Sequence, residues 1–441
     1  MKAKKFYKAL FLLAMPIFLQ EFINASVNLL DQIMVGTLGL DSINGVAFAG
    51  QILFVCMLVM FGVNSGSSIF MGQFWGKRDV ASIRKVMGIC YITNICISFV
   101  FAFGAIVVPE ALIRIYSAES EVIRLGAMYL RIVGPSFLLS AVTTTTNASL
   151  RSIGQTKIPM FTTLIALVSN GALNALFIFG LGWGVAGAAI ATLTARVLEI
   201  TVQQIVIRKL HLPVAAPLRG YLTADAAFIK SFFTITMPVI LNEGMWGLGT
   251  SLYQVVFKAC GNESQGAVQI GSSVLNVFIV IGMGIGSACG IMLANQLGAG
   301  EREDAIVNSR RSLLLACGLS ACMGGLLILL SPVILSFYDV SPDIKATAQL
   351  IMYIIAVALV LKTYNYTTIV GILRSGGDTK YCLIVDVLSV WAIGLPMAAL
   401  GAYFLHLPIH IVMIMMYSEE VFKFIITSFR VRSNKWATQL V

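Results

Sequence analysis

The chain alternates long apolar runs with short polar connections. Each run has about 20 residues or more, the length that an α-helix needs to cross the hydrocarbon core of a bilayer. The predicted spans cover residues 10–35, 46–72, 86–108, 122–146, 158–179, 185–206, 228–257, 268–293, 312–335, 346–373, 381–404 and 409–427. The pattern therefore predicts an all-α, polytopic membrane protein with twelve transmembrane helices, six on each side of a longer polar connection.

The first apolar run carries polar residues at helical spacing. Glu21, Asn24, Asn28 and Asp31 follow one another at intervals of three, four and three residues, which places them on one face of a helix. An ionisable group inside a membrane helix costs roughly 2.5–3.5 kcal/mol, so this face must meet protein or a water-filled cavity. Pro16, at the head of the run, removes one helical hydrogen bond and predicts a kink or hinge.

An internal repeat relates the two halves of the chain. MPIFLQE at residue 15 returns as MPVILNE at residue 237, and the motif R-S-x-G-x-T-K at residues 151–157 returns at 374–380. Since each half has an even number of spans, both halves insert the same way up, related by a pseudo-twofold axis along the membrane normal. We predict an N-terminal six-helix bundle at residues 1–206, a cytoplasmic linker at 207–227 and a C-terminal six-helix bundle at 228–441.

Composition and charge fit this assignment. The 441 residues are 58% hydrophobic and only 11% charged, whereas soluble domains have about 25% charged residues. The net charge of +10 comes from Lys and Arg that gather at alternate connections. By the positive-inside rule, both termini are predicted to be cytoplasmic in a multi-pass protein of the bacterial cytoplasmic membrane. The basic residues thus indicate orientation and not a nucleic-acid partner.

Motifs for cofactors and catalysis are missing from the sequence. The eight cysteines are scattered and form no CxxC or Cys/His cluster. The glycine-rich stretches lack the Gly-Lys-Ser/Thr ending of a phosphate-binding loop, and neither a His/Glu metal motif nor a nucleophile elbow occurs. We therefore expect no cofactor and no metal site, and an enzyme is disfavoured.

The repeat assigns different chemistry to the two halves. The polar stripe of the first run corresponds in the second half to Glu243, Trp246, Thr250 and Tyr253. Carboxylates with carboxamides suit a proton or a small cation, whereas an acid beside aromatic rings suits an organic cation. Packing within the bundle is the alternative explanation for Trp246 and Tyr253.

Further polar residues lie within the apolar runs. Asp31 is about 30 Å along its helix at 1.5 Å per residue, in the outer half of the membrane if the chain enters from the cytoplasm. A capping acid near the surface is the alternative. Asn170, Asn174 and Thr192 can supply neutral partners for Asp31, although such residues also form ordinary hydrogen bonds between helices.

Two charged residues of the second half complete the set of candidates. Lys362 and Asp386 lie inside apolar runs together with Glu243, and these three leave one net negative charge when ionised. Arg131, Arg196 and Glu199 are nearer the span ends, where snorkelling accounts for them. Glu419 and Glu420 in the last run stay unassigned.

The motifs together resemble the multidrug and toxic compound extrusion (MATE) family. The resemblance rests on M-P-x-x-x-x-E at the start of each half, D-x-x-x-x-G at the end of the first run and the doubled L-R-S-x-G-x-T-K loop. It covers essentially the whole chain. The family implies two six-helix bundles that form a V-shaped cleft, and efflux of cationic amphipathic drugs in exchange for protons or sodium.

The resemblance also implies roles for individual residues. Asp31 matches the acid of the family's first helix, held by Asn170 and Thr192, and some members have a second acid where this chain has Asn174. Glu243 matches an acid of the second bundle. The candidate coupling-ion residues are Asp31, Asn170, Asn174, Thr192, Glu21 and Asn28, the candidate substrate-binding residues are Glu243, Trp246, Tyr253, Lys362, Asp386 and Asn24, and the candidate hinge is Pro16.

The resulting hypothesis is a monomeric multidrug antiporter that works by alternating access. H⁺ and Na⁺ cannot be distinguished from the side chains. A flippase for lipid-linked sugars is the nearest alternative, but its cleft would need basic residues for a pyrophosphate. A membrane-embedded enzyme or receptor is a second alternative, which the duplicated halves disfavour.

Overall fold

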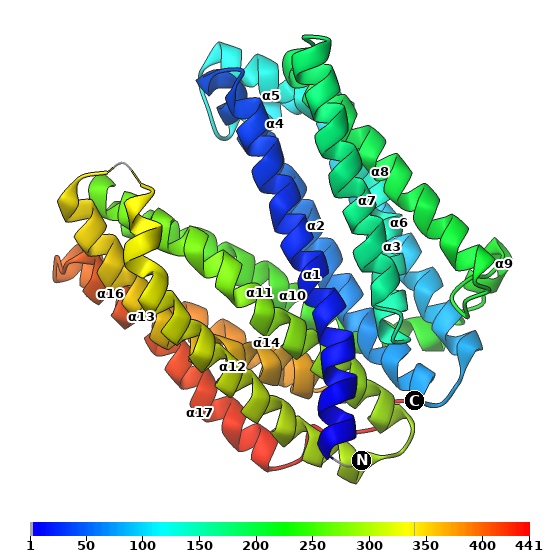
Figure 1. Cartoon of the computed structure of the whole chain (residues 1–441). Coiled ribbons are helices and arrows are strands. Elements are labelled where there is room, and N and C mark those ends of the chain that lie inside the picture. The colour runs from blue at the N-terminus through cyan, green and yellow to red at the C-terminus, as the bar shows by residue number, and fades with distance from the viewer. Residues whose placement is uncertain (1–2, 339) are drawn as a thin grey trace. The chain divides into compact units, whose positions relative to one another are not determined.

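The computed structural model is helical throughout the residues that it describes, 3–338 and 340–441 (Figure 1). The side chains of Asn28, Leu29, Leu218, Asn262 and Glu263 also lie outside the description. Nine of the described helices are long and apolar enough to cross a membrane, and a bent pair of helices brings the number to ten. The predicted all-α fold is confirmed.

The contacts divide the chain into two compact units. The N-terminal unit comprises residues 19–236, and the C-terminal unit comprises the residues before 19 and those from 237 onward. The predicted boundaries therefore differ from the contacts in two places. The sequence placed the residues before 19 in the N-terminal bundle and the residues from 228 to 236 in the C-terminal bundle, whereas the contacts place each segment in the other unit. Both helices that contain these segments are shared by the two units.

The N-terminal unit is built from helices between α1 and α10. They are α1 (Ala3–Gly36), α2 (Leu40–Gly76), α3 (Val80–Val107), α4 (Pro109–Arg114), α5 (Ser120–Val133), α6 (Ser136–Ser152), α7 (Lys157–Asn174), the π-helical segment η1 (Ala175–Gly180), α8 (Gly184–Lys209), α9 (Leu218–Tyr221) and the start of α10 (Ala226–Lys258). The predicted span 122–146 is interrupted, because α5 and α6 meet at Gly134 and Pro135 with a bend of 53°. Proline in this position cannot donate the helical hydrogen bond that would continue the helix.

The C-terminal unit contains the first turns of α1, most of α10 and all later helices. These are α11 (Asn262–Gly298), α12 (Arg302–Ser336), α13 (Pro342–Tyr366), η2 (Thr367–Leu373), η3 (Arg374–Gly376), α14 (Thr379–Val387), η4 (Leu388–Gly394), α15 (Leu395–Ala399), η5 (Leu400–Phe404), α16 (Ile409–Met416) and α17 (Ser418–Arg432). The predicted spans 228–257 and 409–427 correspond to α10 and to α16 with α17. Neither is among the nine helices that are long and apolar enough. Polar residues such as Asn242 and Glu243 lower the hydropathy of α10, whereas the last span is divided into two helices of 8 and 15 residues.

The predicted linker is fastened to α3. Arg84 on α3 donates to the carbonyl oxygens of Pro213 (3.0 Å) and Ala215 (3.2 Å). The Tyr91 and Tyr221 rings meet edge to face at 5.6 Å. These contacts hold the predicted linker against the N-terminal unit.

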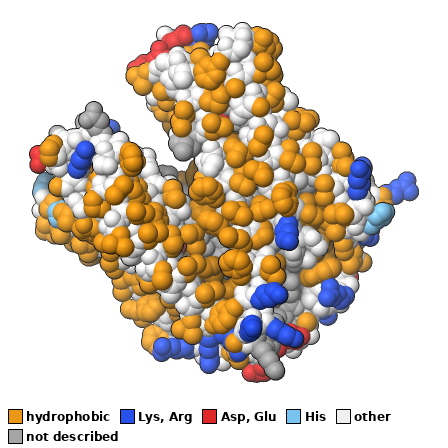
Figure 2. Space-filling view, viewed as in Figure 1, with side chains coloured by type: hydrophobic (Ala, Val, Ile, Leu, Met, Phe, Trp, Pro, Cys, Tyr) orange, Lys and Arg blue, Asp and Glu red, His pale blue; other side chains and the backbone are white. Residues whose placement is uncertain are grey.

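The surface of the helices is apolar, as a lipid-facing surface requires. Figure 2 shows hydrophobic side chains over most of the visible face, with Lys and Arg side chains gathered chiefly in its lower part. Many large apolar side chains are exposed on single helices, including Phe99, Val100 and Phe103 on α3. In a soluble protein such a surface would aggregate, so its natural environment is the bilayer.

Candidate functional site

Asp31 lies on α1 in a group of neutral polar side chains from α7 and α8. The Asn174 side chain donates a hydrogen bond from Nδ2 to Asp31 Oδ1, and also reaches Asn170 Oδ1 at 3.3 Å. Asn170 in turn donates to Thr192 Oγ1 at 3.4 Å. Since α7 and α8 pack against each other, residues distant in sequence meet around Asp31. The structure thus brings together the four residues that the sequence grouped.

The Asp31 carboxylate has no basic partner within ion-pairing distance among the described residues. Arg196 on α8 is the charged residue that acts on it electrostatically. Asn174 is fully buried, and its Oδ1 atom accepts no hydrogen bond within the described part of the chain. A buried carbonyl oxygen without a donor beside a carboxylate is suited to a cation or a proton donor.

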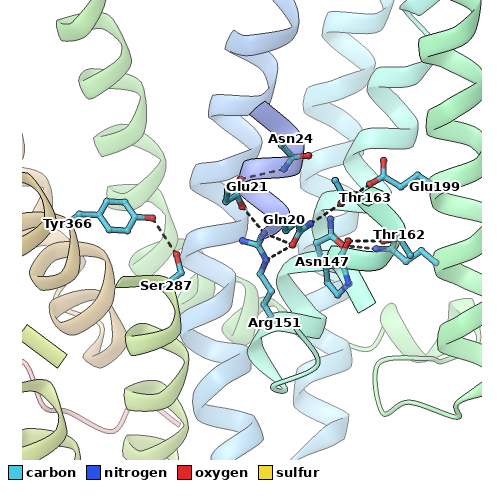
Figure 3. A network of polar contacts seen from close by, with 12 residues as sticks. Gln20, Glu21, Asn24, Asn147, Arg151, Thr162, Thr163, Glu199, Ser287 and Tyr366 are labelled. Atoms are coloured by element: carbon cyan, nitrogen blue, oxygen red, sulfur yellow. Dashed lines mark hydrogen bonds and ion pairs between the residues drawn. The ribbon is translucent and has the colours of Figure 1, made fainter. Parts of the chain in front are cut away.

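Glu21, the other predicted acid of α1, belongs to a different network (Figure 3). Its Oε1 pairs with Arg151 Nη2 at 2.7 Å, and its Oε2 accepts from Asn24 at 3.4 Å. Glu21 and Asp31 are ten residues apart, about 15 Å along the helix. The predicted stripe is therefore divided, with Glu21 and Asn24 bound to Arg151 and Asp31 bound to Asn174. Asn28, whose side chain lies outside the description, cannot be assigned to either group.

The same network continues from α1 to α8. Gln20 accepts from Arg151 Nη2 at 2.6 Å and donates to Thr163 Oγ1 at 3.1 Å. Thr163 donates to Glu199 Oε1 at 3.2 Å, and Arg196 pairs with Glu199 Oε2 at 2.7 Å. Glu199 is 2% exposed. The prediction that Arg196 and Glu199 snorkel from span ends is wrong for Glu199, because the carboxylate is buried in this network.

Glu243 in the C-terminal unit forms a buried ion pair. Its Oε1 lies 2.8 Å from Arg374 Nη1, and Arg374 is 2% exposed. The neighbouring Asn242 donates to Asp386 Oδ2 at 2.9 Å, and Lys423 lies 3.4 Å from Asp386 Oδ1. Glu243 was predicted as a counter-charge for substrate, but Arg374 already neutralises it.

The remaining candidates of this unit connect to the same charges. Lys362 Nζ lies 3.2 Å from Glu420, and Tyr253 donates to Glu419 at 2.7 Å. Lys423 is also 3.8 Å from Glu419. Trp246 alone among the candidates is clearly exposed, at 43%. Tyr253 is thus a hydrogen-bond donor within the buried network, whereas Trp246 presents its ring at the surface of the unit.

The repeat seen in the sequence recurs as a repeat of contacts. The pair Glu21–Arg151 corresponds to Glu243–Arg374, with separations of 130 and 131 residues. The hydrogen bond from Gln20 to Thr163 corresponds to the one from Asn242 to Asp386, with separations of 143 and 144. Each contact lies a few residues after the repeated proline. Sequence comparison alone found the glutamates but not their partners.

The family model for MatE matches residues 16–176 and 245–400 of the chain. These two segments cover most of both repeats. The chain belongs to the MATE family. Members of this family are transporters and not enzymes, and the chain is a multi-pass membrane protein.

Similarity to individual MATE relatives extends over nearly the whole chain. The uncharacterized transporter YisQ of Bacillus subtilis is 25% identical over 97% of this chain and 94% of its own length. The probable multidrug resistance protein NorM of Thermotoga maritima is 21% identical, with coverage of 98% and 94%. An outward-facing multidrug resistance MATE transporter structure superimposes with a TM-score of 0.88 at 19% identity, covering 97% of this chain and 96% of that one. The predicted family and fold are therefore confirmed.

The sequence did not reveal the ion pairs that several charged residues of the site form. Arg151 and Arg374 stand in the repeated loop motif, where a cytoplasmic location explained them. Lys423 lies one turn after Glu419, and Arg196 precedes Glu199 by three residues, spacings that predict ion pairs on a helix. Their burial was the missing information, since spacing does not show which face is covered.

Proposed function

We propose that this MATE protein is a secondary active antiporter that exports cationic amphipathic compounds in exchange for H⁺ or Na⁺. The observation that carries the proposal is the environment of Asp31, a carboxylate within a membrane helix whose direct partner is a neutral amide. A charge in this position is costly unless a cation accompanies it. A proton or a sodium ion bound there removes the cost. Multidrug resistance proteins among the relatives support export as the direction of transport.

The coupling ion would bind to Asp31 with oxygen atoms of Asn170, Asn174 and Thr192 nearby. Sodium favours such a set of carboxylate, carbonyl and hydroxyl oxygens, and a proton needs only the carboxylate. Glu21 is a weaker candidate than Asp31, because Arg151 holds it in an ion pair. The choice between the two ions is left to experiment.

Coupling requires that ion and drug stabilise different conformations. In the proposed cycle, ion binding at Asp31 favours the state that releases drug outside, and ion loss inside favours the state that binds drug. Pro16 lies at the point where α1 passes from one unit to the other, which suits a hinge. One elementary charge across 100 mV supplies about 2.3 kcal/mol, enough for a roughly fifty-fold drug gradient.

The C-terminal unit would supply the negative charge that attracts a cationic drug. Its buried network contains four acids, Glu243, Asp386, Glu419 and Glu420, and three bases, Lys362, Arg374 and Lys423. The network carries one net negative charge when all seven groups are ionised. Trp246 offers an exposed ring for a cation–π contact. An excess of acids over bases in this network does not suit a pyrophosphate, so the flippase alternative is not favoured.

We further propose that the protein acts as a monomer in the cytoplasmic membrane with both termini inside. Lys and Arg at alternate connections support this orientation. Small cationic molecules and lipid are the partners that this function needs.

Asp31→Asn tests the proposal directly. We expect the variant to lose ion-driven efflux of ethidium from cells that lack their own pumps, by about a hundredfold, while it reaches the membrane at wild-type level. Transport in inverted vesicles, with proton and sodium gradients imposed separately, identifies the ion. Unchanged efflux by the variant would exclude Asp31 as the coupling residue.

A further inference from the structure

The N-terminal unit holds a buried acid, Glu199, and a partly buried acid, Asp31, near one arginine. Arg196 Nη1 pairs with Glu199 Oε2 at 2.7 Å, and the same guanidinium acts electrostatically on Asp31. Arg196 stands one helical turn after Thr192, which accepts a hydrogen bond from the Asn170 amide of the Asp31 group. Arg196 therefore pairs with Glu199 and stands on the helical face that carries Thr192 of the Asp31 group.

Competition between the acids follows from this placement. Two carboxylates and one guanidinium leave one net negative charge when all three are ionised. A cation on Asp31 brings the net charge of these groups to zero, and Arg196 then pairs with Glu199 alone. After the cation leaves, both carboxylates attract Arg196, and the buried Glu199 is the costlier of the two to leave without a partner.

We propose that Arg196 is a positioning residue of the cation site, shared between Asp31 and Glu199, and that it makes Asp31 release its cation readily. This inference rests on the proposed function, because it assumes that Asp31 binds the coupling ion. Some members of the family have a second acid at the position of Asn174, and in this chain Glu199 on α8 would take its place. It acts on Asp31 only through its hold on Arg196.

The state of Arg196 can reach α1 through hydrogen bonds. Figure 3 shows Glu199 joined to Thr163, and Thr163 joined to Gln20. Gln20 is held by Arg151, which also pairs with Glu21. Gln20 follows Pro16 by one turn. A shift of Arg196 toward Asp31 leaves Glu199 more dependent on Thr163, and thereby changes the contacts of α1 just beyond its proline.

The proposal predicts opposite effects from the two members of one ion pair. Arg196→Gln removes the cation that competes with the coupling ion, so the ion concentration for half-maximal transport should fall about fivefold, and turnover should fall because release is slower. Glu199→Gln leaves Arg196 to Asp31 alone, so the same concentration should rise about fivefold. A fivefold change corresponds to roughly 1 kcal/mol, the interaction energy expected for two charges in a partly solvated environment. A purely structural ion pair would give shifts in the same direction.

The experiment uses the full-length protein in proteoliposomes, with ethidium as substrate and either Na⁺ at fixed pH or H⁺ without sodium as the driving ion. Arg131→Gln and Glu110→Gln are the matched controls, because they break an exposed ion pair of similar length in the same unit (2.8 Å). Both controls should leave the half-maximal ion concentration unchanged. The double variant Arg196→Gln/Glu199→Gln removes both charges, and should match Arg196→Gln.

The outcomes separate this inference from the function on which it rests. Shifts in the same direction, or no shift, in variants whose transport still requires Asp31 would overturn the shared-arginine role and leave the antiporter proposal standing. Coupled transport by Asp31→Asn would overturn both. Should Glu199→Gln fail to fold, the double variant replaces it, and a wild-type ion concentration in that variant would refute the proposal.

Discussion

At the scale of the residue, the charged side chains that meet within the helices of this MATE protein are mostly paired, and acids slightly outnumber bases among them. Glu21 and Glu243 each have an arginine at hydrogen-bonding distance, whereas Asp31 has an amide. Buried ion pairs contribute little net stability, but removal of one partner is expensive because the other charge stays buried. Asp31 differs from both glutamates in having a neutral partner, which under the proposed function leaves its charge for a mobile cation.

The Glu243–Arg374 pair permits a test of charge balance against direct contact. Glu243→Gln should lower the free energy of unfolding by about 3 kcal/mol, because Arg374 loses the carboxylate that neutralises it. The single variant also removes the net negative charge of the buried network in the C-terminal unit, so transport of cations should fall more than transport of neutral compounds.

The double variant Glu243→Gln/Arg374→Gln is the control. It restores the net charge of −1 and removes the unpaired guanidinium, so most of the stability and the preference for cations should return. Thermal unfolding in detergent and transport of a cationic and a neutral dye measure the two effects. Equal losses for both dyes in the single variant would contradict a role of the network's net negative charge in the preference for cations.

At the scale of the element, close backbone approaches position the helices. A Cβ atom at Gly88 on α3 would lie 1.8 Å from the carbonyl oxygen of Tyr221 in α9. Arg84 and Tyr91, which flank Gly88 by about one turn each, hold the same connection. The connection after α8 therefore rests on α3 because glycine leaves room for it.

Gly88→Ala should displace α9 from α3. Alanine is favoured over glycine in a helix by about 1 kcal/mol, but here the clash with a backbone oxygen outweighs that gain. We expect a net loss of about 2 kcal/mol, read as a lower unfolding temperature. Gly50→Ala on α2 is the matched control, since nothing lies within 4 Å of its added Cβ, and it should be neutral or slightly stabilising.

At the scale of the whole molecule, the two units share α1 and α10. The contacts change unit at Leu19 and at Met237, close to Pro16 and to its repeat partner Pro238. Under the proposed function, a bend at the proline of such a helix would move residues of both units. This sharing gives a physical reason for a proline at the start of each half.

Pro16→Ala should make α1 stiffer by restoring a backbone hydrogen bond. If α1 bends during transport, turnover should fall roughly tenfold, which corresponds to about 1.4 kcal/mol in the barrier, whereas the ion concentration for half-maximal transport should change little. Pro332→Ala, in an α12 that lies within one unit, should leave turnover near the wild-type value. A wild-type rate for Pro16→Ala would rule out the hinge.

The sequence by itself determined the helices, the repeat and the family. Apolar runs of membrane length have only one stable form in lipid, because the backbone must satisfy its own hydrogen bonds there. It also placed Asp31 with Asn170, Asn174 and Thr192. Such residues can be recognised from the sequence, because a polar side chain within an apolar run needs a polar partner in the membrane.

Only the tertiary structure showed which charges are already neutralised. Glu21 and Asp31 lie on the same face of one helix and have similar neighbours in the sequence. Even so, Arg151 from α6 pairs with Glu21, whereas the Asn174 carboxamide from α7 donates to Asp31. Arg196 with Glu199, and Arg374 with Glu243, depend on helices that meet from distant parts of the chain or on burial that spacing does not reveal. Whether a carboxylate is free to bind an ion depends on what packs against it, and packing is a property of the fold.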